Sequence, residues 1–435
     1  MSILVAVAAL PLVVLLGISG LRAPLRVLLP IYALLVPFGS GLTLAVGIPS
    51  PFDSLTSLFG LAVIIGLGIQ LLVHRATGPI RTEVLAWIAF AGLNGVTYLW
   101  SVNRGRTASQ FFILASLLAL YVLVSMLPID PGDVARLRDG IIVGGTLACA
   151  YGFYLLLTGA LPEEAAGLPR FATAGGAGDA SDPNITAAVL VLPIVLGLAR
   201  TLRARSGGVR LAAGLATALM VVGLLLTASR GGALAATVGI IVLLAHERRS
   251  ALVGVGVVAT VAVVVLASTL LAPEQVERLQ TSGSSGRTNI YDVAFVACSE
   301  HCLTGSGLNT FREVHRDAYL RTPGAVGVRI DEPPHNILLG AVIELGVAGL
   351  LILVGAVVLT IRSLRHLPRD VRGAPLAAII GLLVSNAFLG NLYFKYFWLV
   401  LLYAVVVSAG HREQLDDDPR ADPGVPTRNL VAATP

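Results

Sequence analysis

The segment TASRGGALAATVGIIVLLAHERR, Thr227–Arg249, holds the pattern that decides the fold. Residues 211–226 before its polar break are apolar apart from small residues, and residues 233–245 after it are apolar again. Each run approaches the length of about 20 residues that a helix needs to cross a bilayer. The segment therefore predicts two membrane-spanning helices, with Arg230 at the turn between them and two glycines easing that turn.

The same alternation extends along all 435 residues. Hydrophobic residues make up 56% of the chain and charged residues 13%, and the mean hydropathy is +0.85. Soluble globular proteins carry about 25% charged residues. We predict an all-α polytopic membrane protein, a bundle of about 12–13 transmembrane helices. The expected spans lie near 3–20, 27–47, 57–73, 83–100, 108–127, 141–159, 184–199, 211–228, 230–245, 251–271, 335–361, 374–391 and 393–409.

Two hydrophilic connections divide the predicted bundle. A short connection, 160–183, lies within the first transmembrane part, 1–271. The large loop, 272–334, is expected to contain short amphipathic helices. Residues 335–410 complete the bundle, and the charged, Pro-rich tail 411–435 is predicted to be disordered.

Arginine placement predicts the orientation, because cytoplasmic connections are enriched in positive residues. One alternating set of connections carries 16 such residues and the other short connections carry five. The richer set holds Arg22, Arg26, Arg75, Arg81, Arg136, Arg138, Arg200, Arg203, Arg205, Arg210, Arg248, Arg249, Arg362, Arg365, Arg369 and Arg372. The other set holds Arg104, Arg106, Arg170, Arg230 and Lys395. The richer set is therefore expected inside, with Arg230 and both hydrophilic connections outside. This clustering between apolar runs gives no indication of a nucleic-acid partner, despite a net charge of +5.

Three expected helix starts on the outer side carry polar side chains. Asp182 precedes Pro183 and is suited to cap the next span, which places Asn184 at its start. Arg287 follows a Gly/Ser segment, where it is either a phosphate ligand or a solvated loop arginine. Arg230 either snorkels to lipid headgroups or holds an anion at a helix start, where backbone N–H groups favour negative charge.

A fourth helix start follows two prolines at His335 and Asn336. Imidazole exchanges its proton near neutral pH, which suits a general base. Glu344 lies nine residues further on, about 13 Å deeper along a helix. An acid at that depth is costly unless it is paired or lines a polar cavity, so Glu344 is a functional candidate.

The cysteines do not form a metal site. Cys298 and Cys302 stand four residues apart in a segment too isolated for a four-ligand zinc site. They are either a disulfide in an oxidising exterior or two free thiols. No other set of residues has the spacing of metal ligands.

Taken in order, several motifs resemble the O-antigen ligase and Wzy-type polymerase superfamily. They are Asp-Pro-Asn after the short outer connection, Ser-Arg-Gly-Gly opening a helix, Gly-Arg in the large loop, HCLTGSGLNTF (His301–Phe311) and PHNILLGAVIELGVAGLL (Pro334–Leu351). The resemblance covers residues 80–410. Cys302 stands where the family usually has proline after the histidine, which leaves the role of His301 open.

The resemblance implies an inverting glycosyltransferase without metal or other cofactor, folded as a helical bundle like other lipid-linked-sugar transferases. The implied location is the bacterial cytoplasmic membrane, among membrane lipids, with the active face outside. The donor would be a polyprenyl-diphosphate-linked oligosaccharide, and the acceptor a glycan, lipid or protein. Arg230 and Arg287 match arginines thought to hold the donor diphosphate, and His335 matches the histidine proposed to act on the acceptor. The expected substrate-binding residues are Arg230, Arg287, Asp182, Asn184, Asn336 and Glu344.

Two alternatives remain open from the residues. Transfer to a different acceptor and polymerisation on another lipid-linked chain share the same donor chemistry. A transporter of a small anion such as bicarbonate would instead show broken helices and polar residues near the midplane of several spans. Glu344, Asn94 and Asn386 lie inside expected spans, but no inverted repeat is evident.

Overall fold

The protein is built from helices. The computed structural model describes residues 20–39, 42, 54–74, 80–161, 171–172, 182–247, 287–322, 333–390 and 392–416. These residues contain no strand, and six of their helices are long and apolar enough to cross a membrane. The predicted all-α polytopic membrane fold is therefore confirmed.

Most helices coincide with expected spans. In chain order the elements are α2 (Leu28–Leu35), η1 (Val36–Phe38), α3 (Leu55–His74), α4 (Thr82–Val96), η2 (Thr97–Leu99), α5 (Arg104–Met126), α6 (Pro131–Leu157), α7 (Pro183–Arg203), α8 (Gly207–Leu226), α9 (Arg230–His246), α12 (Arg287–His301), α13 (Phe311–Tyr319), α14 (Ile337–Ser363), η4 (Leu364–His366), α15 (Arg369–Asn386) and α16 (Lys395–Asp416). The expected span 251–271, and nearly all of the one at 3–20, lie outside the described residues. The total of 12 or 13 spans therefore stays a prediction.

Two boundaries differ from expectation. Within the described residues, the helix in the span expected at 27–47 ends at Phe38, because Gly39 leaves the helical region with φ at 55°; residues 40, 41 and 43–47 lie outside the described part of the chain. At the other end of the chain, α16 continues to Asp416, into the segment predicted to be a disordered tail.

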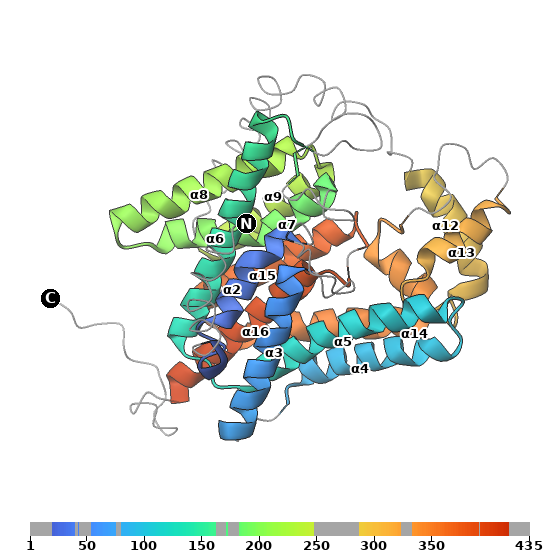
Figure 1. Cartoon of the computed structure of the whole chain (residues 1–435), viewed down its shortest axis with the longest axis horizontal. Helices are drawn as coiled ribbons and strands as arrows, with labels where there is room; N and C mark the ends of the chain where they lie inside the picture. The colour runs from blue at the N-terminus through green and yellow to red at the C-terminus, as the bar shows by residue number, and fades with distance from the viewer. Residues whose placement is uncertain are drawn as a thin grey trace, which may run out of the picture.

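The helices form one bundle with a small helical pair at one end (Figure 1). In it, α4 packs against α5 and α14, and α9 packs against α7 and α15. The large loop contributes α12 and α13, which pack on each other and on α14. On α13 the buried face carries Phe311, Val314 and Ala318, whereas Arg316 and Asp317 are exposed. The loop therefore contains the short amphipathic helix that the sequence predicts.

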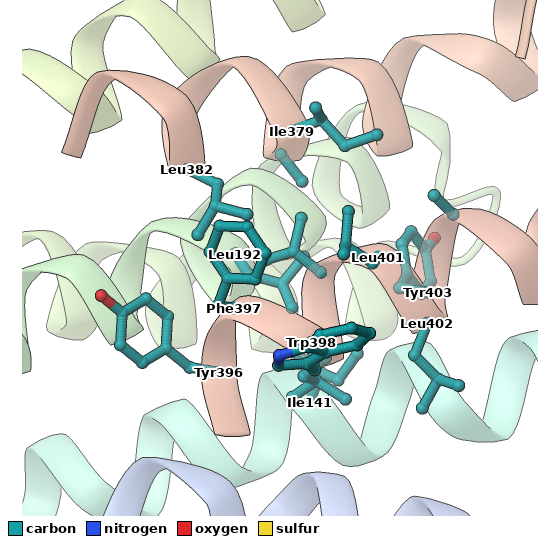
Figure 2. Close-up of a cluster of buried hydrophobic side chains, with 14 of the residues drawn as sticks. Ile141, Leu192, Ile379, Leu382, Tyr396, Phe397, Trp398, Leu401, Leu402 and Tyr403 are labelled. Atoms are coloured by element: carbon teal, nitrogen blue, oxygen red, sulfur yellow. The ribbon is translucent and has the colours of Figure 1, made fainter. Parts of the chain in front are cut away.

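The core is centred on α16. Residues 396–407 of this helix are all buried, which is typical of a helix that is apolar on every side. Figure 2 shows α16 side chains packed among Ile141 of α6, Leu192 of α7 and Ile379 of α15. The Trp398 ring lies 5.3 Å from that of Trp87 on α4, in edge-to-face geometry.

Arginine-rich connections of neighbouring helices meet at one end of the bundle. Arg203 at the end of α7 binds the Glu247 carboxylate after α9, at 2.7 Å from Nε, and the Asp370 carbonyl in α15. Arg369 donates to the Ala245 carbonyl at 2.9 Å. The starts of α7 and α9 therefore lie together at the opposite end, which carries Arg230.

Candidate functional site

Arg230 is the first residue of α9, and its side chain is exposed. The hydroxyl of Ser229 caps this helix by accepting from the Gly232 N–H at 3.2 Å. The turn before the helix is made by Ala228, which takes the positive φ of 51°. The Ser-Arg-Gly-Gly motif is therefore a capped helix start that presents its arginine at the surface.

The two glycines after Arg230 do not ease the turn, contrary to expectation. Both lie inside α9, where they allow close packing. A Cβ at Gly232 would overlap the Ala187 methyl of α7, and a Cβ at Gly231 would lie 3.1 Å from the Phe388 side chain. The start of α9 is therefore seated between α7 and the residues that follow α15.

The start of α7 lies beside the start of α9. Asp182 caps α7, because its carboxylate accepts from the Asn184 N–H at 2.7 Å. Pro183 occupies the first turn, and Asn184 is half-buried. Since Ala187, one turn on from Asn184, contacts Gly232, the motif at 182–184 and the Ser-Arg-Gly-Gly motif are brought together.

The start of α14 reaches the same place. Asn336 caps α14 by accepting from the N–H groups of Leu338 at 2.9 Å and Leu339 at 3.1 Å. Its amide donates to the Ala387 carbonyl at 3.3 Å, next to the Phe388 that contacts α9. His335, immediately before this cap, is half-buried with φ at 45°. Residues 387–388 therefore join the starts of α9 and α14.

Arg230, Asp182, Asn184, His335 and Asn336 are thus gathered at one end of the bundle, where α7, α9 and α14 begin. Asp182 and Asn336 are occupied as helix caps. The backbone of Arg287 opens α12, but its side chain lies outside the described part of the chain. Its approach to Arg230 and His335 stays a prediction.

Glu344 lies near a break in α14. The helix is interrupted at Gly346, which takes φ of 73°. The turn after α12 fills this break: the Ser306 and Gly307 N–H groups donate to the carbonyls of Ile343 and Glu344, each at 2.9 Å. In return, the Val347 N–H donates to the Cys302 carbonyl at 2.9 Å. The large loop therefore supplies the hydrogen bonds that the broken helix lacks.

The Glu344 carboxylate is buried and accepts from three donors of the protein itself. The N–H groups of Asn309 and Phe311 donate at 3.0 and 3.1 Å, and the Tyr393 hydroxyl donates at 2.9 Å. Glu344 is thus paired, as its depth requires, and connects α14 to α13 and to the connection before α16.

A second set of contacts fastens the large loop to α5. Arg106 Nη1 lies 2.7 Å from a Glu313 carboxylate oxygen on α13, and the Asn103 amide donates to the same oxygen at 3.1 Å. Cys298 and Cys302 form a disulfide at the end of α12. The loop is therefore attached to the bundle at its α13 end as well as at the break in α14.

Sequence reasoning missed the partners of Glu344. Tyr393 stands 49 residues away in an apolar connection, and no spacing links the two. The glycines at 305 and 307 indicate a turn, but nothing in them identifies α14 as its partner. Within the described residues, no group of three or more His, Cys, Asp or Glu could hold a metal ion.

Residues 215–354 match a family model described as O-antigen ligase. This segment of the chain is similar to the O-antigen ligase family. The match runs from α8 to α14 and includes Arg230, Arg287, His335 and Glu344, so the resemblance drawn from the motifs is confirmed. A search of curated proteins found no match.

The family match does not favour a transporter. Two polar residues of the expected spans form hydrogen bonds within their own helices: Asn94 donates to the Phe90 carbonyl at 2.7 Å and Asn386 to the Leu382 carbonyl at 2.9 Å. A broken helix is present in α14, but the large loop fills the break. These features describe an O-antigen ligase-like, multi-pass membrane protein.

The close packing of α9 on α7 can be tested by Gly232→Ala. The added methyl overlaps Ala187, so we expect a loss of about 1–3 kcal/mol in unfolding free energy, typical of overpacking. Gly355→Ala is the matched control, because a Cβ there meets nothing within 4 Å and alanine favours a helix by up to about 1 kcal/mol. Thermal unfolding in detergent measures both. Equal melting temperatures for the two variants would show that the close contact is unimportant.

The hydrogen bonds by which Glu344 holds the start of α13 can be tested by Glu344→Gln. The amide keeps the size of the side chain but replaces one acceptor with a donor, so the N–H of either Asn309 or Phe311 loses its acceptor. We expect faster hydrogen exchange in peptides covering residues 306–314. Glu300→Gln is the control, since Glu300 forms an exposed ion pair with Arg321, and such pairs contribute little. Unchanged hydrogen exchange in Glu344→Gln would show that these hydrogen bonds do not hold the start of α13.

Proposed function

We propose that this protein transfers or polymerises glycan from a polyprenyl-diphosphate-linked donor onto an acceptor hydroxyl at the outer face of the bacterial cytoplasmic membrane. The match of residues 215–354 to the O-antigen ligase family model supports the class of reaction. The observation that supports the site is that the residues next to Arg230 and His335 contact neighbouring positions: a Cβ at Gly231 would lie 3.1 Å from Phe388, and the Asn336 amide donates to the Ala387 carbonyl. In the proposed site, Arg230 supplies a cation and His335 accepts a proton.

The electrostatics of the helix starts favour an anion between α9 and α14. Helix N-termini carry a positive partial charge. Asp182 offsets that charge for α7 with its carboxylate, whereas α9 and α14 are capped by the neutral side chains of Ser229 and Asn336. The diphosphate is therefore best placed at the starts of α9 and α14, beside Arg230.

The proposed reaction is a single displacement at the anomeric carbon. The acceptor oxygen forms the new glycosidic bond while the bond to the diphosphate breaks, and the configuration inverts. The acceptor proton passes to His335 as general base. The departing diphosphate takes the bonding electron pair, and Arg230 and Arg287 stabilise its growing charge through paired N–H groups. No metal ion takes part in this scheme.

The site assignment predicts the effect of three single substitutions. Arg230→Ala, Arg287→Ala and His335→Ala should each lower glycan transfer by about a hundredfold or more, as expected for groups that act on the transition state. Arg287→Lys should also lose much activity, because an ammonium cannot reproduce the planar fork. The measurement uses purified protein in nanodiscs with a defined polyprenyl-diphosphate oligosaccharide, sizing the product and identifying its acceptor.

The control for these variants is Arg316→Ala, which removes an exposed arginine from α13 on the same loop. It should retain activity, because α13 presents this side chain away from its buried face. Near-normal transfer by all three alanine variants would refute the site, and an equal loss in Arg316→Ala would point to general charge attraction.

The outer-face assignment is tested by Leu320→Cys. Leu320 is 75% exposed after α13, Cys149 is buried, and the other two cysteines are paired. A membrane-impermeant maleimide should therefore label the new thiol in intact cells. Labelling only after lysis would invert the orientation.

A further inference from the structure

Two connections at one end of the bundle expose large apolar side chains. After α4, Leu99 is 68% exposed, and Trp100 and Val102 beside it are also exposed. In the turn after α12, Leu303 is 80% exposed. Because water disfavours large contiguous apolar surface, these side chains need an apolar environment if they lie together.

Backbone hydrogen bonds bring the two connections together. The Val102 N–H donates to the Ser306 carbonyl at 2.9 Å, which ties the residues after α4 to the turn after α12. The Val347 N–H donates to the Cys302 carbonyl, next to Leu303. Leu303 and the Leu99–Val102 segment therefore border the same point, the break in α14.

The surface that continues from this point faces lipid. Beyond the break, α14 exposes Val347, Leu351, Val354 and Val358, a spacing of three or four residues that lies on one face of a helix. This helix is long and apolar enough to span the membrane, so its exposed apolar stripe contacts acyl chains. Leu303 extends this stripe beyond the end at Val347.

The polar neighbours of the patch have the composition of a membrane interface. Trp100 belongs to a residue type that is enriched at the headgroup level, and arginines there extend toward the headgroups. Arg104 is exposed, and its guanidinium donates to the Leu99 carbonyl at 3.0 Å. Exposed apolar side chains and an exposed arginine thus lie within a few residues of each other, which suits the boundary between acyl chains and headgroups.

We propose that the Cys302–Gly305 turn of the large loop is inserted into the membrane interface, with Leu303 among the acyl chains and Trp100 and Arg104 at the headgroups. The partner is the lipid bilayer itself, and continuity with the lipid-facing stripe of α14 identifies it. The loop is then held at the level of the interface, at the point where it fills the break in α14. This inference does not depend on the proposed function.

A photo-crosslinking amino acid, benzoylphenylalanine, tests the insertion at position 303. Leu320 provides the matched control, because it lies in the same loop and is similarly exposed, at 75% against 80%, but follows α13 instead of touching the break. The full chain is placed in nanodiscs of phosphatidylethanolamine and phosphatidylglycerol, and lipid adducts are measured by mass spectrometry. We expect severalfold more adduct at 303 than at 320. Equal yields, or adducts between two copies of the chain in place of lipid adducts, would overturn the proposal.

The native tryptophans allow a second test that leaves the turn unchanged. The chain has three tryptophans; Trp87 and Trp398 are buried, and Trp100 is exposed. Lipids brominated on the acyl chain near the headgroup should quench the native fluorescence, and Trp100→Phe should remove most of that quenching. Quenching that is absent in the native protein, or unchanged in Trp100→Phe, would refute the interfacial position.

Discussion

The break in α14 at Gly346 is the constraint on which the candidate site of this protein depends. A helix that borders lipid must satisfy its backbone groups within the protein, because acyl chains offer no hydrogen-bond partners. Gly346 leaves the helical path and frees the carbonyls of Ile343 and Glu344 and the N–H of Val347. The turn from Cys302 to Gly307 supplies a hydrogen-bond partner for each of these three groups. The large loop therefore completes the backbone hydrogen bonding of α14.

This arrangement links the loop to the site. A Cβ at Gly305 would lie 2.5 Å from the Glu344 carbonyl, and a Cβ at Gly346 would lie 2.5 Å from the Leu303 carbonyl. Both positions also have positive φ, so substitution of either glycine would push the turn away from the helix. His335 and Asn336 directly precede the segment of α14 before the break, and Asn336 bonds to Ala387. The start of α9, which begins at Arg230, packs on the neighbouring Phe388. The loop that carries Arg287 is thus fixed to the same helix segment that carries His335.

The sequence predicted what depends on local patterns. Apolar runs identified the helices, and Asp182 was predicted to cap one of them because capping requires only a few neighbouring residues. The Ser-Arg-Gly-Gly motif and His335-Asn336 were placed at helix starts, but capping by Ser229 and Asn336 was not predicted. The break at Gly346 was not predictable, since the glycine stands in a continuous apolar run and its conformation is set by the turn packed against it. The partners of Glu344 come from three distant positions, so only the fold reveals them. The glycines after Arg230 were assigned to a turn, but Ala228 makes that turn and the glycines serve contacts with Ala187 and Phe388.

The position of Arg230 makes physical sense when its cost is considered. A cation in the first turn of a helix faces the positive end of the helix dipole, which is unfavourable by roughly 0.3–1 kcal/mol. The cap of α9 is neutral Ser229, and the neighbouring α14 start is capped by neutral Asn336, so neither cap offsets this accumulation of positive charge. A diphosphate placed there interacts favourably with the arginine and with both helix starts at once. Because its charge grows as the glycosidic bond breaks, the same arrangement favours the transition state over the bound donor. Under the proposed function, Arg230 therefore acts as a direct ligand of the donor diphosphate.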